Sequence, residues 1–113
     1  MDSMEKRLEK LEYYQALLLQ MVDTKRFPFY QLVMEKGLCK TEIEEIDKLC
    51  YELNSLYEEQ KTQGLVIFTD LLTRFAGSLN SRLEVEETIQ ALYKQNLYPL
   101  LMADFLELMK SSY

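Results

Sequence analysis

From residue 4 to residue 22 the sequence reads MEKRLEKLEYYQALLLQMV. Five hydrophobic residues and one glutamine recur in it at alternating intervals of four and three: Met4, Leu8, Leu11, Gln15, Leu18 and Val22. This is the heptad spacing of a coiled-coil seam, and so narrow a seam fits a partner helix better than a globular core. We therefore expect residues 1–22 to form a coiled-coil-like helix, with Ser3 as its N-cap, that makes the oligomer interface.

The residues beside this seam differ between its two halves. In the first half, Arg7 and Glu12 flank the seam at positions that would pair across a parallel coiled coil. In the second half the flanking residues are Tyr14, Leu19 and Met21, so the helix is apolar nearly all round. Because such helices are usually buried, we expect this half to enter the body of the protein or of an assembly. The polar seam residue Gln15 would lower stability but fix register or oligomer number.

Composition limits the class of protein. A chain of 113 residues, 48% of them hydrophobic, is long enough for one domain with a real core. Only three glycines and two prolines interrupt it, which favours helices over a many-turned β fold. The formal charge is −6 and no segment is basic, so a nucleic-acid or anionic-membrane surface is not expected. Without a signal-peptide pattern or a long apolar run, the expectation is a cytoplasmic protein with free thiols.

Capping signals predict a helical array over residues 28–111. The second helix should begin at Pro28 and end at a left-handed Gly37. The third should open with the capping box Thr41-x-x-Glu44 and end by Gly64.

The remaining helices are predicted from apolar spacing and turn residues. Leu65-Val66-Ile67-Phe68 is ambiguous between a short strand and a helical lead-in, and we interpret it as the start of a helix that reaches Gly77. A fifth helix should begin between residues 81 and 85, with Ser81-x-x-Glu84 as a second capping box, and stop at a left-handed Asn96. The sixth should have Pro99 in its first turn.

Three patterns imitate functional motifs. Residues 29–50 resemble a helix-turn-helix, but four carboxylates would stand at the start of the recognition helix, where phosphates and base edges are met. The acidic residues could in principle bind a metal, yet the chain has no histidine and they crowd first turns, where they stabilise the helix dipole. The aromatic cluster around Pro28 fits either packing against the first helix or a binding surface, and we favour packing.

Three single residues deserve separate interpretations. Asp104 borders an apolar stripe. Such a carboxylate can titrate abnormally, but it more often reaches solvent or a hydrogen-bond donor. Cys39 precedes a helix and adjoins a lysine, which favours thiolate, but the chain lacks the usual base for nucleophilic catalysis. Cys50 lies on an apolar stripe and should be a small core residue. We assign no catalytic, cofactor-binding or metal site.

Several segments, in order along nearly the whole chain, resemble the YhaI-like family of small uncharacterised proteins from Bacillus and related bacteria. They are Met1-Asp2-Ser3-Met4, Leu11-Glu12-Tyr13-Tyr14, Pro28-Phe29-Tyr30, Lys36-Gly37-Leu38, Leu71-Leu72, Phe75-Ala76-Gly77, Leu79-Asn80, Glu87-Thr88-Ile89 and Ala91-Leu92-Tyr93. The resemblance implies an all-helical array that assembles into oligomers. It carries over no activity, substrate or catalytic residue.

Together these patterns predict a single all-α domain over residues 1–113, with about five or six helices and antiparallel αα corners. The function that they favour is a non-enzymatic, homo-oligomeric protein-interaction or regulatory module, without nucleic-acid or membrane partners and without a cofactor. The alternative is an enzyme or small-ligand-binding protein whose site forms between protomers. A polar-lined cavity with converging groups such as Asp104 would favour that alternative.

Overall fold

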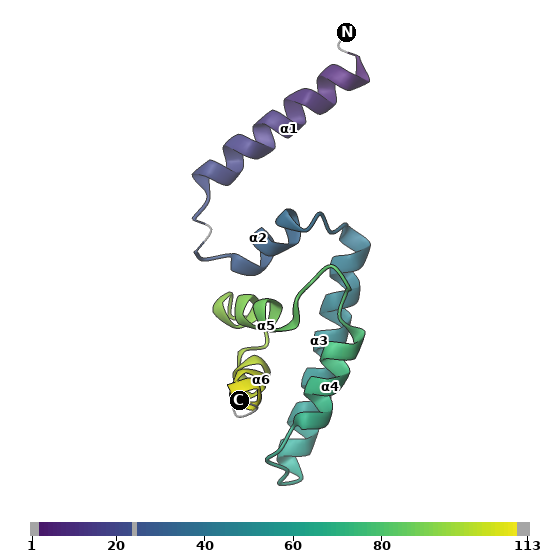
Figure 1. Ribbon diagram of the computed structural model, residues 1–113, viewed down its shortest axis with the longest axis vertical. Helices are drawn as coiled ribbons and strands as arrows, with labels where there is room; N and C mark the ends of the chain where they lie inside the picture. Colours follow the sequence, from purple (N-terminus) through teal and green to yellow (C-terminus); the bar gives the residue numbers. More distant parts are fainter. Residues whose placement is uncertain (1–2, 24, 111–113) are drawn as a thin grey trace.

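The computed structural model describes residues 3–23 and 25–110. In these ranges the chain forms six helices and no β-strand, as the all-α prediction requires. Their bounds are α1 (Met4–Met21), α2 (Pro28–Glu35), α3 (Lys40–Thr62), α4 (Thr69–Ser78), α5 (Val85–Lys94) and α6 (Pro99–Lys110). The longest helix, α3, runs the length of the body with α4 antiparallel beside it. Helix α6 lies beside this pair and contacts α4, α5 packs against α6, and α2 packs against α5 (Figure 1).

The predicted ends of the first two helices are confirmed. Ser3 caps α1, since its hydroxyl accepts the backbone N–H of Lys6 at 3.2 Å. Pro28 is the first residue of α2, where its missing N–H costs nothing. Gly37 ends α2 with a φ of +67°, and the N–H of Leu38 reaches back to the carbonyl of Val33 at 3.1 Å. This is the bond that closes a helix over a left-handed residue.

The capping box of α3 lies two residues earlier than predicted. The residue before the helix is Cys39, and the carboxylate of Glu42 accepts its backbone N–H at 3.0 Å. Thr41 and Glu44 therefore lie inside the first turns rather than at the cap. Glu42, rather than Glu44, is the carboxylate of the capping box, and it also contacts Asn80 and Arg82.

The prediction of a helix from Leu65 is wrong. Residues 65–68 have no regular structure, and α4 begins only at Thr69. Gly64, with a φ of +87°, ends the turn after α3, and the chain then passes along the tip of the α3–α4 pair before turning back. Only Phe68 of this segment is buried, whereas Val66 is 83% exposed. A helix here would have carried the chain away from α3.

The fifth helix begins at the late end of its predicted window. Glu84 caps it, because its two carboxylate oxygens accept the N–H groups of Glu86 at 3.1 Å and Glu87 at 2.7 Å. Ser81 is not the cap. At the other end, Asn96 has a φ of +62°, which confirms the predicted left-handed corner.

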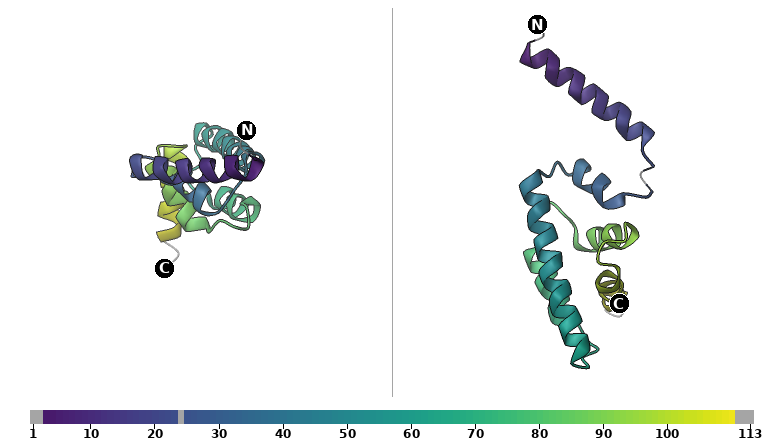
Figure 2. Two further views of the ribbon diagram at one scale, coloured as in Figure 1. Left: turned by 90° about the horizontal axis from the view of Figure 1, so that it is seen from above. Right: turned by 180° about the vertical axis from the view of Figure 1, so that it is seen from behind.

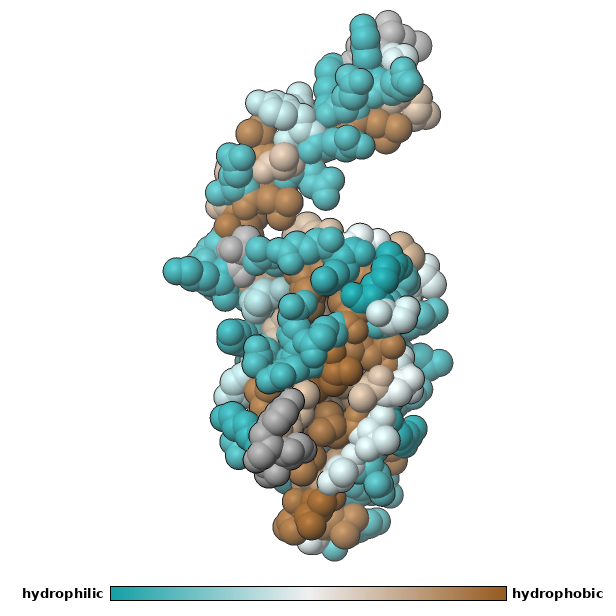
Figure 3. Space-filling view, in the orientation of Figure 1, coloured by the Kyte–Doolittle hydropathy of each residue, from teal (hydrophilic) through white to brown (hydrophobic). Residues whose placement is uncertain are grey.

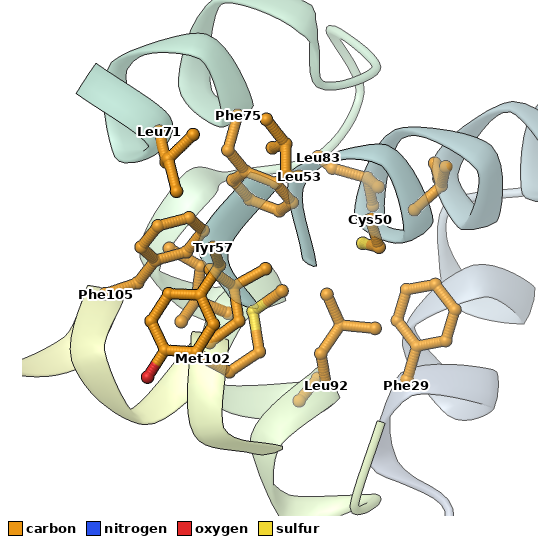
Figure 4. Packing of buried hydrophobic residues seen from close by; sticks show 14 of the residues in the cluster. Phe29, Cys50, Leu53, Tyr57, Leu71, Phe75, Leu83, Leu92, Met102 and Phe105 are labelled. Carbon is orange, nitrogen blue, oxygen red and sulfur yellow. The ribbon is translucent and has the colours of Figure 1, made fainter. Parts of the chain in front are cut away.

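The core lies where α3 meets the other four body helices. Its α3 stripe is Ile46, Cys50, Leu53 and Tyr57. The ring of Tyr57 packs edge-on to Phe68 with centroids 4.7 Å apart, and Phe75 of α4 meets Phe105 of α6 at 5.7 Å. Figure 4 shows Phe105 and Met102 of α6 facing Leu71, Phe75 and Leu53 across this interior, with Cys50, Phe29 and Leu92 at one side.

Helix α1 stands apart from this body. None of its residues is buried, and it projects beyond α2 in the views of Figures 1 and 2. The chain measures 63 × 24 × 24 Å with a radius of gyration of 17.4 Å. A compact chain of this length would have a radius of gyration of about 13 Å. We expected the C-terminal half of this helix to be buried in the body or in an assembly, and within the single chain it is not buried.

Candidate interaction surface

The six predicted seam residues are all exposed, five on α1 and Val22 at its C-cap. The exposed fractions of its five apolar members range from 46% for Val22 to 70% for Met4. Gln15, the polar member, is exposed as well. The residues outside the seam add further apolar area, with Tyr13, Tyr14, Leu17, Leu19 and Met21. This is more hydrophobic surface than an isolated helix normally presents to water.

The apolar surface continues from α1 onto the outer face of α2. A hollow of about 220 Å³ separates the C-terminal half of α1 from α2 and is lined by Leu19, Val22, Phe27, Tyr30, Gln31 and Met34. A second hollow, of about 240 Å³, includes the seam residue Gln15. Figure 3 shows the hydrophobic side chains gathered at the end of α1 nearest the body. We call this continuous region, from the α1 seam to Met34, the α1–α2 surface.

Of the predicted aromatic cluster, Phe29 is in the core, while Phe27 and Tyr30 belong to this surface. Their rings stack with centroids 6.1 Å apart and an interplanar angle of 5°. The cluster therefore serves both roles: Phe29 packs in the core, and Phe27 and Tyr30 lie on the surface.

Two side chains from distant parts of the sequence, Gln95 and Arg82, hold α2 in place. Gln95, at the end of α5, accepts the N–H groups of Phe29 at 2.8 Å and Tyr30 at 3.1 Å through its Oε1. These are the first two helix donors after Pro28, and the residue before the helix, Phe27, has no side-chain oxygen to cap them. At the other end, the guanidinium of Arg82 donates to the carbonyls of Lys36 at 3.4 Å and Gly37 at 3.2 Å. An eight-residue helix needs such support, because short helices are marginal alone.

Arg82 also joins α2 to α3. Its guanidinium is paired with the carboxylate of Glu42, which further accepts the amide N–H of Asn80 at 2.8 Å. The pairing with Arg82, followed by the bond from the Cys39 backbone and that from Asn80, lowers the pKa of Glu42 to about 2. Sequence reasoning noticed Glu42 only as one of several acidic first-turn residues, since its partners are about forty residues away.

Asp104 accepts a hydrogen bond from the hydroxyl of Tyr57. The same hydroxyl lies 3.4 Å from the carbonyl of Leu100. Burial and the contact with Asp104 raise the pKa of Tyr57 to about 12, so its hydroxyl remains a donor at neutral pH. The second interpretation offered for Asp104, that it meets a hydrogen-bond donor, is confirmed. The pair is a tie between α3 and α6.

A second tyrosine–aspartate pair lies just before the start of α6. The hydroxyl of Tyr98 donates to Oδ1 of Asp47 on α3 at 3.0 Å. Burial, with the hydrogen bond to Asp47, raises the pKa of Tyr98 to about 12. The backbone of Tyr98 is left-handed, with a φ of +48°, which is rare for so bulky a residue. The sequence patterns predicted no role for Tyr98 or Asp47, because Asn96 alone accounted for the left-handed turn after α5.

The two cysteines behave differently. Cys39 is exposed before α3, and Cys50 is buried in the core. Burial, aided by the charge of Asp47, raises the pKa of the Cys50 thiol to about 12. Cys50 is therefore a packing residue, as predicted, because its thiolate is disfavoured.

Two of the acidic residues, Glu42 and Glu84, cap helices through their carboxylates. Within the described residues no three or more cysteine and carboxylate side chains gather as a metal site would require. Helix α3 does begin with Glu42, Glu44, Glu45 and Asp47, so its first turns present negative charge. Among the described helices, none is both long and apolar enough to cross a bilayer.

Residues 1–110 match a family model described as a protein of unknown function, DUF1878. The chain belongs to the DUF1878 family. The match spans α1 as well as the body, so the projecting helix is part of the DUF1878 unit. The family description assigns no activity or site residue, and the function of this DUF1878 chain must be argued from its surface.

Proposed function

We propose that this protein is a cytoplasmic, non-enzymatic interaction module that acts as a homo-oligomer joined through α1. The observation that carries the proposal is that the α1 seam has five apolar members and only Gln15 as a polar one, and that no residue of α1 is buried, although the body has a complete core without it. The resemblance to the YhaI-like family and the two free thiols agree with it.

The seam supplies a physical reason for association. Burying one leucine side chain yields roughly 1.5–3 kcal/mol, and a monomer leaves this unrealised at Leu8, Leu11 and Leu18. In a parallel pair Arg7 and Glu12 would lie across the interface from each other. Gln15 is then the one polar residue inside the seam, and it restricts the register and the number of helices.

The α1–α2 surface extends the proposed interface beyond the seam. Because α2 is fixed at both ends by Gln95 and Arg82, its outer residues Tyr30 and Met34 form a firm platform beside α1. Large aromatic and methionine side chains are the residues that interfaces favour. A partner helix on the seam would therefore also cover the two hollows between α1 and α2.

The experiment compares two triple variants by light scattering and circular dichroism. Leu8→Ala/Leu11→Ala/Leu18→Ala removes the seam and should lower the particle mass to that of one chain. Lys6→Ala/Tyr13→Ala/Gln20→Ala is the matched control, since these residues lie on the helix face opposite the seam, and it should keep the wild-type mass. Both variants should retain the circular dichroism of the folded body. An unchanged mass for the seam variant would refute the proposed interface.

A further inference from the structure

A groove in the body lies apart from the α1 seam. It has a volume of about 510 Å³ and is formed by α3, the start of α2, Leu92 of α5 and the α5–α6 corner. This volume is within the range of small-ligand sites, which are mostly apolar with a few polar groups. Its inner side includes Phe29, Cys50 and Leu92, which Figure 4 shows grouped together at one side of the core. The groove is thus supported by rigid packing.

Four of the residues that line the groove are aromatic. Tyr30, Tyr51 and Tyr98 line it together with Phe29, from three different segments of the chain. Tyr30 and Tyr51 are 50% and 65% exposed, so their rings are accessible from solvent. Aromatic rings from several sides are the environment that binds quaternary ammonium groups, because the ring faces carry negative potential.

The charged residues of the groove also favour a cation. Two carboxylates, Glu44 and Asp47, and one ammonium, Lys48, line it, which leaves a net negative charge. Glu44 is partly compensated by Lys40 at 3.8 Å, in a pair exposed to solvent. Asp47 uses Oδ1 for the Tyr98 hydroxyl, so the carboxylate and an aromatic ring are held next to each other. A cation would be favoured in this setting and an anion disfavoured.

Tyr98 is held there against its backbone preference. Its left-handed φ of +48° is unfavourable for a side chain of this size, and the hydrogen bond to Asp47 spans 51 positions of sequence. Such strained residues gather at ligand-binding sites, where the surrounding structure over-determines them. The corner could have been closed by Asn96 alone, so the position of Tyr98 is an additional feature.

We propose that this groove binds a small organic cation with an apolar body, its ammonium group lying against the tyrosine rings beside Asp47 and its apolar part over Phe29 and Ile46. The residues of this site all come from one chain, and Tyr30 is the one that it shares with the α1–α2 surface.

The test uses three probes of the same shape and different charge. They are benzyltrimethylammonium, its uncharged carbon analogue neopentylbenzene, and the anion phenylmethanesulfonate. Binding is followed by methyl NMR on protein labelled at isoleucine. The chain has four isoleucines, of which Ile43 and Ile46 line the groove, whereas Ile89 is in the core and Ile67 lies at the exposed α3–α4 turn.

We expect the cation to shift the Ile43 and Ile46 signals in a saturable way and to leave the Ile67 signal unchanged. Its Kd should be at least about tenfold lower than that of the sulfonate. Asp47→Asn keeps an oxygen acceptor for Tyr98 and should weaken the cation several-fold while leaving neopentylbenzene unaffected. Asp70→Asn, the same change on α4 outside the groove, should have no effect.

Four results would overturn the proposal. The first is equal or tighter binding of the sulfonate or the neutral analogue. The second is an unchanged cation Kd in Asp47→Asn. The third is binding seen only when the seam is removed by Leu8→Ala/Leu11→Ala/Leu18→Ala, because the groove would then be occupied by another chain in the assembled protein. Loss of binding in both Asp47→Asn and Asp70→Asn would point to a general charge effect and would equally contradict a specific site.

Discussion

The side-chain oxygen of Gln95 lies 2.8 Å from the backbone nitrogen of Phe29, so the end of α5 caps the beginning of α2 across 66 positions of sequence. The same oxygen accepts the N–H of Tyr30 at 3.1 Å. One amide thereby replaces the local cap that Phe27 cannot provide. This contact connects the core to the α1–α2 surface, because α2 carries Tyr30 and Met34 on its outer face.

Removing this cap should destabilise the fold. We expect Gln95→Ala to lower the free energy of unfolding by about 1–2 kcal/mol, since two helix donors lose their partner. Gln95→Glu keeps an oxygen at the helix N-terminus and should restore most of the loss. Gln90→Ala, an exposed position on the same helix, serves as the control in urea unfolding. Equal stability of Gln95→Ala and Gln90→Ala would contradict the capping role.

The Glu42–Arg82 pair should make stability depend on acid. Because the folded pKa of Glu42 is about 2 and its ordinary value is 4.5, the ionised form stabilises the fold above about pH 4.5. That contribution is lost as the pH falls toward 2. The melting temperature of Glu42→Gln should thus lie below that of the wild type at pH 7, and the gap should close by about pH 2.

A pH series of melting temperatures, with one control variant, checks the assignment to Glu42. The melting temperature of each protein is followed from pH 7 to pH 2 by circular dichroism. Glu45→Gln removes an exposed carboxylate of the same helix and should follow the wild-type curve. A gap between wild type and Glu42→Gln that stays constant with pH would argue against an ionised Glu42 as the stabilising group.

The two left-handed corners should respond differently to substitution. Gly37 has open space around its Cα, so Gly37→Val should cost at least about 1 kcal/mol through its φ of +67° and not through a clash. Asn96→Gly should be neutral or slightly stabilising, because glycine adopts a φ of +62° readily. Denaturant melts of both variants decide this. Wild-type stability for Gly37→Val would disprove the argument.

The acidic start of α3 should prevent specific binding to DNA. Although α2, the Gly37 corner and α3 follow one another as in a helix-turn-helix, the first turns of α3 present carboxylates. In an anisotropy titration at near-physiological salt we expect affinity no tighter than the nonspecific range of about 10⁻⁴ to 10⁻⁶ M. Sequence-dependent binding below about 10⁻⁷ M would contradict this.

Local chemistry made much of the fold predictable. Ser3, Pro28, Gly37 and Asn96 have the predicted roles because each acts through its own backbone or that of near neighbours. The predicted start of α4 is wrong because it depends on distant parts of the chain. An apolar run such as residues 65–68 has the same local pattern in a helix and in a turn, and only the return of the chain along α3 decides between them.

The contacts that define the candidate sites could not be predicted from local sequence patterns. Gln95, Arg82 and Tyr98 reach residues 45 to 66 positions away, and no local pattern distinguishes them from ordinary polar surface residues. The seam residues are different, since their spacing alone marks them. Their exposure in the single chain is what makes α1 a candidate interface rather than a core helix.

Association through α1 can be measured on the wild-type protein by sedimentation equilibrium. At about tens of micromolar we expect a particle mass above that of one 13.5 kDa chain, and a melting temperature that rises with protein concentration. Gln15→Leu should tighten the assembly while loosening its register or oligomer number. A monodisperse particle of one chain, melting at the same temperature at every concentration, would contradict the account.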